Sequence, residues 1–164
     1  MKMDHVNIVV RDLEGAVTFY SRVMGMEQTF ATALEGAWIE SVTGLKDAQA
    51  RCVFLQFPHY DFRLELLQYI SPQAEISPHN SLAHSPGIRH LAFETNEMDV
   101  LIARLQVATV KFVSPPVTVP FPVGNRGTKR LCYFHDPDGT LLEAAAYSAA
   151  ETSSPETTAT TRDA

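Results

Sequence analysis

The sequence DHVNIVVRDLEGAV at residues 4–17 has a counterpart 85 residues later, RHLAFETNEMDVLI at residues 89–102. Each copy opens with a strand-like apolar run and continues with apolar residues spaced three and four apart. The first pattern predicts a strand and the second predicts an amphipathic helix. His5 and His90 occupy the second position of the two copies. The chain is therefore predicted to contain two related strand–helix units.

Further patterns extend this repeat. Asp12 is predicted to cap the first helix, Gly25 to end it, and Asn96 to cap the second helix. Strand-like runs follow at residues 51–57 and 62–70 in the first half, and at residues 128–134 and 140–147 in the second. RLELLQY matches TLLEAAAY at a shift of 78 residues, which aligns Glu65 with Glu143. We therefore predict an α+β fold in which two paired βαβββ modules form a cupped mixed sheet.

The boundaries of these modules follow from composition. A stretch with three Ser-Pro pairs has no periodicity, and the C-terminal residues contain almost no large apolar side chains. The predicted parts are a first module at residues 3–70, a linker at residues 71–86, a second module at residues 87–147 and a disordered tail at residues 148–164.

Charge and hydropathy exclude several classes of protein. The formal net charge of the 164 residues is -6, whereas a nucleic-acid-binding surface needs a basic face. No apolar run approaches the ~20 residues that span a bilayer, and the N-terminal residues do not resemble a signal peptide. We therefore expect a cytoplasmic protein without a nucleic-acid or membrane partner. Cys52 and Cys132 are expected to be free thiols.

Four residues of the repeat are candidate metal ligands: His5, Glu65, His90 and Glu143. Singly, a strand histidine is more often hydrogen-bonded in the core, and a strand glutamate more often faces water. Both glutamates, however, lie inside apolar runs, where burial of an unpaired carboxylate costs several kcal/mol. If the two halves pair about a pseudo-twofold axis, two imidazoles and two carboxylates converge. Such a set suits Zn, Ni, Co, Mn or Fe and leaves positions for water or substrate.

Four motifs in this order resemble the vicinal oxygen chelate superfamily, which includes glyoxalase I, methylmalonyl-CoA epimerase, extradiol dioxygenases and antibiotic resistance proteins. The motifs are DHVNIVVRDLEGAVTFYSRVMGM, RLELLQY, GIRHLAFET and YFHDPDGTLLE. The resemblance covers residues 3–147 and implies paired βαβββ modules around a metal. It also implies that His5, Glu65, His90 and Glu143 hold that metal.

The ligand pattern His, Glu, His, Glu resembles that of bacterial glyoxalase I, which implies proton transfer next to a carbonyl of a small-molecule substrate. Either Glu143 or Glu65 would then be the catalytic base. The alternative is an Fe(II) extradiol-type dioxygenase, although this chain lacks the histidine expected shortly before Tyr133 in that family's motif. A third hypothesis is a metal-free protein that binds or sequesters a small molecule.

The sequence also indicates candidate substrate-binding residues and an oligomeric state. Arg63 shares a strand face with Glu65 and is a candidate for binding an anionic substrate, or for neutralising nearby carboxylates. Asn125 and Arg126 belong to a basic segment that either grips a carboxylate or phosphate or forms a solvated turn. We expect a homodimer, with His5 and His90 on adjacent central strands. Whether the modules pair within one chain or between two stays open.

Overall fold

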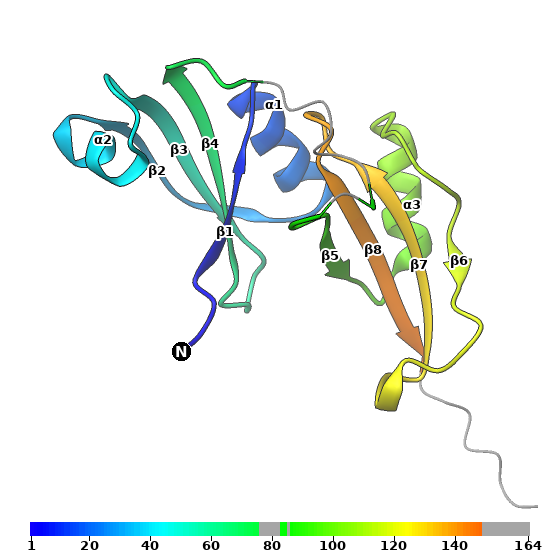
Figure 1. Ribbon diagram of the computed structural model, residues 1–164. Helices are drawn as coiled ribbons and strands as arrows, with labels where there is room; N and C mark the ends of the chain where they lie inside the picture. The colour runs from blue at the N-terminus through cyan, green and yellow to red at the C-terminus, as the bar shows by residue number, and fades with distance from the viewer. Residues whose placement is uncertain (76–82, 85, 149–164) are drawn as a thin grey trace, which may run out of the picture.

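Two four-stranded mixed sheets form the framework of the computed structural model, which describes residues 1–75, 83–84 and 86–148 (Figure 1). The first sheet has the order β1-β4-β3-β2 and the second the order β5-β8-β7-β6. The strands are β1 His5–Val9, β2 Glu27–Glu35, β3 Gln49–Gln56, β4 Arg63–Ser71, β5 Leu91–Glu94, β6 Val117–Thr118, β7 Thr128–His135 and β8 Leu141–Ser148. In each sheet the first strand runs parallel to the last, and the other pairs are antiparallel. The predicted α+β class with two related modules is confirmed.

The helices lie where the apolar periodicity predicts them, with one correction. They are α1 Leu13–Thr18, its π-helical continuation η1 Phe19–Val23, α2 Ala37–Thr43, α3 Met98–Val107 and the 3-10 turn η2 Gly124–Arg126. The Asp12 side chain accepts a hydrogen bond from the Gly15 N–H, so the predicted cap is confirmed. The Asn96 cap is wrong, because α3 begins after Glu97, whose N–H is bound by the Thr95 hydroxyl instead. The sequence pattern does not locate β2, α2 or β6.

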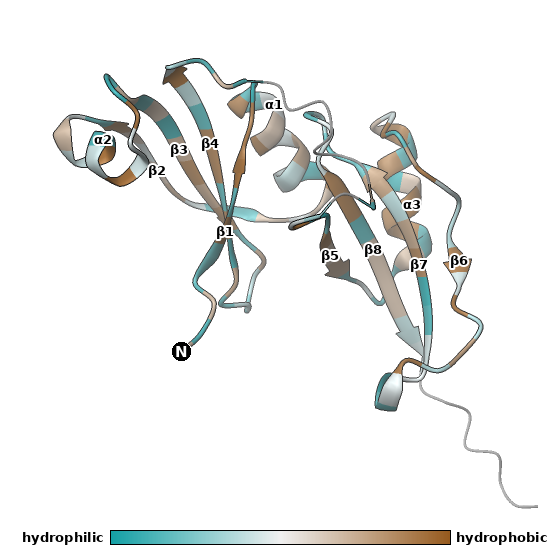
Figure 2. Cartoon of the chain, viewed as in Figure 1, coloured by the Kyte–Doolittle hydropathy of each residue, from teal (hydrophilic) through white to brown (hydrophobic). Residues whose placement is uncertain are grey.

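Helices α1, η1 and α3 share one core with both sheets. The buried residues of this core alternate along the strands, as Leu64 and Leu66 do on β4 and Leu142 and Ala144 do on β8. Hydrophobic residues, coloured brown, occur along strands of both sheets and on α3 (Figure 2). Because successive side chains on a strand point to opposite faces, Glu65 and Glu143 lie on the faces away from this core.

Two polar contacts join the modules at the DPDG turn. The Tyr20 hydroxyl donates to Asp136 Oδ2 at 2.9 Å, and both side chains are buried. Asp136 Oδ1 also accepts from the backbone N–H groups of Asp138 and Thr140. Arg11 pairs with Asp138 at 2.7 Å. The turn therefore links the first helix to the second sheet.

The prediction that His5 and His90 lie on adjacent strands is wrong for this chain. Strand β1 pairs with β4, and β5, which begins directly after His90, pairs with β8 of the other sheet. Helix α1 lies between the two sheets (Figure 1). The physical reason is that α1 and η1 bury apolar side chains against the same core as the second sheet, which keeps the sheets apart.

The structure also bears on the predicted free cysteines, on membrane-spanning helices, and on the predicted linker and tail. Cys52 and Cys132 are buried free thiols, as predicted. Among the described residues, no helix has the length and apolarity needed to cross a membrane. The predicted tail at residues 148–164 overlaps β8 at Ser148, and residues 149–164 lie outside the described residues, as do residues 76–82 and 85 of the predicted linker.

Tyr20→Phe should lower the free energy of unfolding by about 1–3 kcal/mol, because buried Asp136 loses a hydrogen-bond donor. Burial and the charge of Asp136 raise the pKa of Tyr20 well above its ordinary value. Wild-type stability should therefore fall as pH rises above about 10, where the unfolded chain ionises this tyrosine, and the variant should lack this part of the fall. Denaturant unfolding at pH 8 and pH 10.5 measures both effects.

Exposed Tyr60 provides the control, since Tyr60→Phe removes a hydroxyl from a side chain that is largely in solvent. If both variants unfold like the wild type, Tyr20 does not join the modules energetically.

Candidate metal centre

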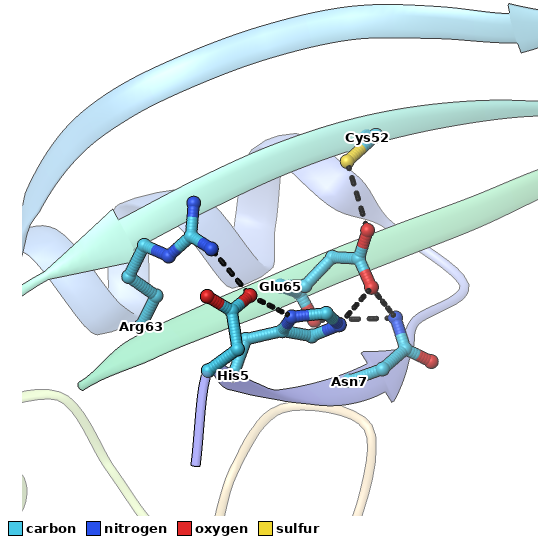
Figure 3. A network of polar contacts seen from close by, with 6 residues as sticks. His5, Asn7, Cys52, Arg63 and Glu65 are labelled. Atoms are coloured by element: carbon cyan, nitrogen blue, oxygen red, sulfur yellow. Dashed lines mark hydrogen bonds and ion pairs between the residues drawn. The ribbon is translucent and has the colours of Figure 1, made fainter. Parts of the chain in front are cut away.

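The first half-site consists of His5 and Glu65. The parallel register of β1 and β4 places His5 opposite Arg63 and Asn7 opposite Glu65. His5 Nε2 lies 3.4 Å from Glu65 Oε2, and the Asn7 amide donates to the same oxygen at 3.0 Å. The Cys52 thiol contacts the other oxygen, Oε1, at 3.4 Å (Figure 3). Two neutral donors therefore hold the Glu65 carboxylate beside the imidazole.

The opposite side of the His5 ring contacts a residue that the sequence analysis does not single out. His5 Nδ1 lies 2.7 Å from Asp4 Oδ2, which also accepts a hydrogen bond from Arg63. The hydrogen bonds from His5 and Arg63 lower the pKa of Asp4 below its ordinary value. The Arg63 guanidinium also lies 4.8 Å from the centre of the Phe54 ring. In this structure Arg63 therefore neutralises a nearby carboxylate, one of its two predicted roles.

The second half-site consists of His90 and Glu143. His90 Nε2 lies 3.2 Å from Glu143 Oε2, and Lys129 Nζ lies 2.5 Å from Glu143 Oε1. Tyr133 is the partner of Glu143 in the β7–β8 register, and its ring centre lies 5.1 Å from that of His90. Only 3% of the Glu143 side chain is exposed, against 16% for Glu65. A buried carboxylate is here compensated by an ammonium group.

The two half-sites are repeat-equivalent but differ in what surrounds the carboxylate. Phe54 stands opposite Glu65 as Tyr133 stands opposite Glu143, and each ring packs on the histidine of its half-site. Ala50 occupies in the first sheet the position that Lys129 occupies in the second. Glu65 therefore has uncharged donors, whereas Glu143 has a cation.

The protonation states of the neighbouring groups follow from burial and charge. Burial, together with the Glu65 carboxylate, raises the pKa of Cys52 to about 12, so the thiol stays protonated at neutral pH. Desolvation opposes the charged form of Lys129, but its hydrogen bond and charge interaction with Glu143 outweigh this and raise the pKa. Burial and the Glu143 charge raise the pKa of Tyr133. Lys129 is therefore charged, and Tyr133 and Cys52 are neutral.

The spacing of nitrogen and oxygen in each half-site fits a bound metal ion. Since an ionised Asp4 only accepts hydrogen bonds, His5 Nδ1 is the donor, and a neutral ring would present a lone pair at Nε2. In that tautomer two acceptors, His5 Nε2 and Glu65 Oε2, would face each other at 3.4 Å, and a cation between them would bind both. Two ligands at about 2.1 Å from one metal, at roughly 90–110°, lie about 3.0–3.4 Å apart. The separations of 3.4 Å and 3.2 Å in the two half-sites match this value.

The four predicted ligands meet as two pairs within this chain. In the part of the chain that the structure describes, no three His, Cys, Asp or Glu side chains are grouped closely enough to hold a metal ion. The pairs belong to separate sheets, each on the face away from the shared core. One chain therefore provides two half-sites rather than one complete four-ligand centre.

The remaining predicted site residues lie at the far end of the second sheet. Arg126 in η2 pairs with Glu94, and its guanidinium lies 3.8 Å from the centre of the Tyr147 ring. Glu94 and Tyr147 are on the same strand faces as Glu143 by alternation along β5 and β8. Asn125, in the same turn, is exposed. Arg126 thus extends over the face that carries the second half-site.

Four neighbours of the half-sites are not predicted from the sequence to be site residues: Asp4, Asn7, Lys129 and Tyr133. Asn7 and Tyr133 could have been found, because strand alternation places them on the ligand face. Alternation would put Asp4 on the face opposite His5, but β1 begins only at His5, so the rule does not apply. The partner of Lys129 becomes visible only when β7 and β8 are in register.

Comparison with known proteins supports one family. The family model described as "Glyoxalase/Bleomycin resistance protein/Dioxygenase superfamily" matches residues 2–144. The uncharacterized protein YwbC of Bacillus subtilis is 24% identical over 143 residues, which cover 87% of this chain and 94% of that protein. A glyoxalase family protein from Bacillus cereus has a TM-score of 0.79 at 25% identity, covering 90% of this chain and 94% of that one.

A more distant structural neighbour is the fosfomycin resistance protein FosX from Listeria monocytogenes. Its TM-score is 0.57 at 19% identity, with 89% of this chain and 93% of that chain covered. This likeness concerns the fold alone.

Lys129→Met should destabilise the chelator-treated protein by about 3 kcal/mol or more, because it leaves Glu143 buried without its cation. The double variant Lys129→Met/Glu143→Leu should recover most of this loss, since it removes both charges. Denaturant unfolding of the three proteins measures the effect.

Lys111→Met, at an exposed position, is the control. Equal stability of Lys129→Met and wild type would show that the ion pair contributes nothing to folding.

Proposed function

The chain belongs to the glyoxalase/bleomycin resistance protein/dioxygenase superfamily, and we propose that it is a divalent-metal-dependent enzyme that transfers a proton next to a carbonyl group of a small substrate. The observation that carries this proposal is the spacing of each histidine Nε2 from a glutamate oxygen, 3.4 Å and 3.2 Å, which matches neighbouring ligands of one metal ion. Zn, Ni, Co, Mn and Fe all accept two nitrogen and two oxygen ligands.

The complete centre is proposed to form between two copies of the chain. In a twofold dimer, the first half-site of one copy meets the second half-site of its partner, and the symmetry creates two identical four-ligand centres. This arrangement uses all four candidate ligands although one chain keeps them on separate sheets. It also removes the need for β1 and β5 to be neighbours within a chain.

Two features of the single chain support such a dimer. Strands β1 and β5 are both edge strands in the sheets that the structure describes. The unpaired backbone N–H and C=O groups of an edge strand favour association with another chain. Exposed apolar side chains accompany these edges, with Val9 on β1 at 44% exposure and Ile88 just before β5 at 78%. Association would bury part of this apolar surface.

The two glutamates are proposed to divide the chemistry. When bound, the metal ion withdraws charge from a substrate carbonyl and so acidifies the neighbouring C–H group. Glu143, buried and paired with Lys129, stays a fixed ligand. Glu65 is more exposed and is held by the uncharged Asn7 and Cys52, so it is the carboxylate that accepts the proton. Because Oε2 is also the proposed ligand atom, Glu65 would have to leave the metal before it accepts the proton.

The anionic end of a substrate is proposed to bind at Arg126 and Asn125. Arg126 extends over the face of the second sheet that carries His90 and Glu143. Its guanidinium has five N–H donors, more than the ion pair with Glu94 uses, so donors remain for a substrate anion. Asn125 in the same turn adds an exposed amide. Arg63, by contrast, already binds Asp4 beside His5, so it acts within the half-site.

The dimeric centre predicts that two defective variants complement each other. His5→Ala and His90→Ala chains should each lose tight metal binding, whereas co-expressed chains should recover about a quarter of the wild-type sites. The reason is that random pairing makes about half of the dimers mixed, and each mixed dimer contains one intact centre of two. Metal content by mass spectrometry, after purification without a metal-affinity step, measures the recovery.

A matched control pairs His5→Ala with Glu65→Gln, which damages the same half-site in both chains. No mixed dimer then has an intact centre, so the metal content should not exceed that of Glu65→Gln alone. If the His5→Ala and His90→Ala mixture also restores nothing while both variants dimerise, the centre does not form between chains.

The division of roles predicts different outcomes for the two glutamates. Glu65→Gln should keep weakened metal binding, because the amide still offers one oxygen, but should lower proton exchange by a factor of about 10² or more. Glu143→Gln, whose amide also offers one oxygen, should weaken metal binding but lower exchange less when the metal is saturating, because the proposed base is intact. The assay is exchange of the carbon-bound hydrogen with deuterated water for 2-oxo hemithioacetals, acyl-CoA thioesters and cyclic ketones. Exposed Glu27→Gln on β2 is the control.

Two results would contradict proton transfer. Oxygen consumption with a catechol and Fe(II), without exchange of any carbonyl substrate, would establish a dioxygenase. A wild-type protein that binds no divalent metal would favour a small-molecule binding protein.

A further inference from the structure

A carboxylate outside the four-ligand set contacts the ring of His5. Asp4 Oδ2 lies 2.7 Å from His5 Nδ1, the nitrogen that points away from Glu65. An ionised carboxylate has no proton to give, so the hydrogen bond requires a proton on Nδ1. In a neutral imidazole this leaves the lone pair on Nε2, directed toward Glu65 Oε2.

Asp4 has a second partner besides His5. Arg63 donates to the same Asp4 oxygen that faces His5, and the β1–β4 register places Arg63 directly opposite His5. The Arg63 guanidinium is in turn held over the Phe54 ring, which packs edge-on against His5. The four side chains therefore contact one another in a closed ring, in which one Asp4 oxygen binds both His5 Nδ1 and the Arg63 guanidinium.

We propose that Asp4 is a positioning residue, which fixes His5 in the tautomer with the proton on Nδ1 and so directs the Nε2 lone pair into the metal position. Metal-binding histidines generally donate their second nitrogen to such an acceptor, and loss of the acceptor weakens metal binding by about 10–100-fold. The effect on metal affinity rests on the proposed function. The effect on the tautomer does not, since it needs no metal.

The test measures the tautomer of His5 in the metal-free protein. Long-range ¹H–¹⁵N correlation spectra, recorded above the pH at which the ring signals stop changing, distinguish a proton on Nδ1 from one on Nε2. The wild type should carry the proton on Nδ1, and Asp4→Ala should shift the population toward Nε2. Arg63→Met should shift it in the same direction by a smaller amount. His5→Gln identifies the His5 signals.

The same proteins then bind Zn²⁺ in competition with a chelator. Asp4→Ala should weaken binding by at least about 10-fold relative to wild type. Asp61→Ala is the matched control, because Asp61 is another exposed aspartate that pairs with a cation, Lys2, near the N-terminus. It should leave the tautomer and the affinity unchanged, and all variants should keep the wild-type melting temperature.

The possible failures are distinguishable. A proton on Nε2 in the wild type, or an unchanged tautomer in Asp4→Ala, overturns the role of Asp4. A shifted tautomer with unchanged Zn²⁺ affinity also overturns it, because orientation would then not matter for binding. A wild type without any Zn²⁺ affinity, but with the predicted tautomer shift, overturns the proposed metal function alone.

Discussion

Two carboxylates that lie between buried apolar neighbours on their strands impose the main constraint on this structure. The residues directly before and after Glu65 are buried in the shared core, and so are those directly before and after Glu143. A carboxylate in such surroundings needs hydrogen bonds or a cation, because an unpaired charge would cost several kcal/mol. The hydrogen-bond donors and the cation that stabilise these carboxylates are also the residues that surround each half-site.

The two halves meet the constraint differently, and this breaks the symmetry of the repeat. Asn7 and Cys52 give Glu65 neutral donors, whereas Lys129 gives Glu143 a positive charge. In both halves the histidine Nε2 faces one carboxylate oxygen at the separation expected for two ligands of one ion. A repeat with equivalent ligands thus contains two carboxylates with unequal surroundings, which is the basis for giving them unequal roles.

The packing of the helices explains why one chain holds two incomplete centres. Helices α1, η1 and α3 share a single core with both sheets, and the Tyr20–Asp136 hydrogen bond joins the modules at its edge. Both ligand faces point away from this core, so the modules cannot close on each other without disrupting it. A second copy of the chain can complete the centres while each core stays intact.

The sequence by itself determined the repeat, the α+β class, the Asp12 cap and the repeat equivalence of His5 with His90 and of Glu65 with Glu143. These features depend on local periodicity and on the alternation of side chains along a strand, which neighbouring residues fix. Only the tertiary structure decided that the sheets are separate, that Asp4 and Arg63 contact each other beside His5, and that Lys129 compensates Glu143. Those contacts join residues from different strands or just outside a strand, where register and helix packing, rather than local spacing, set the distances.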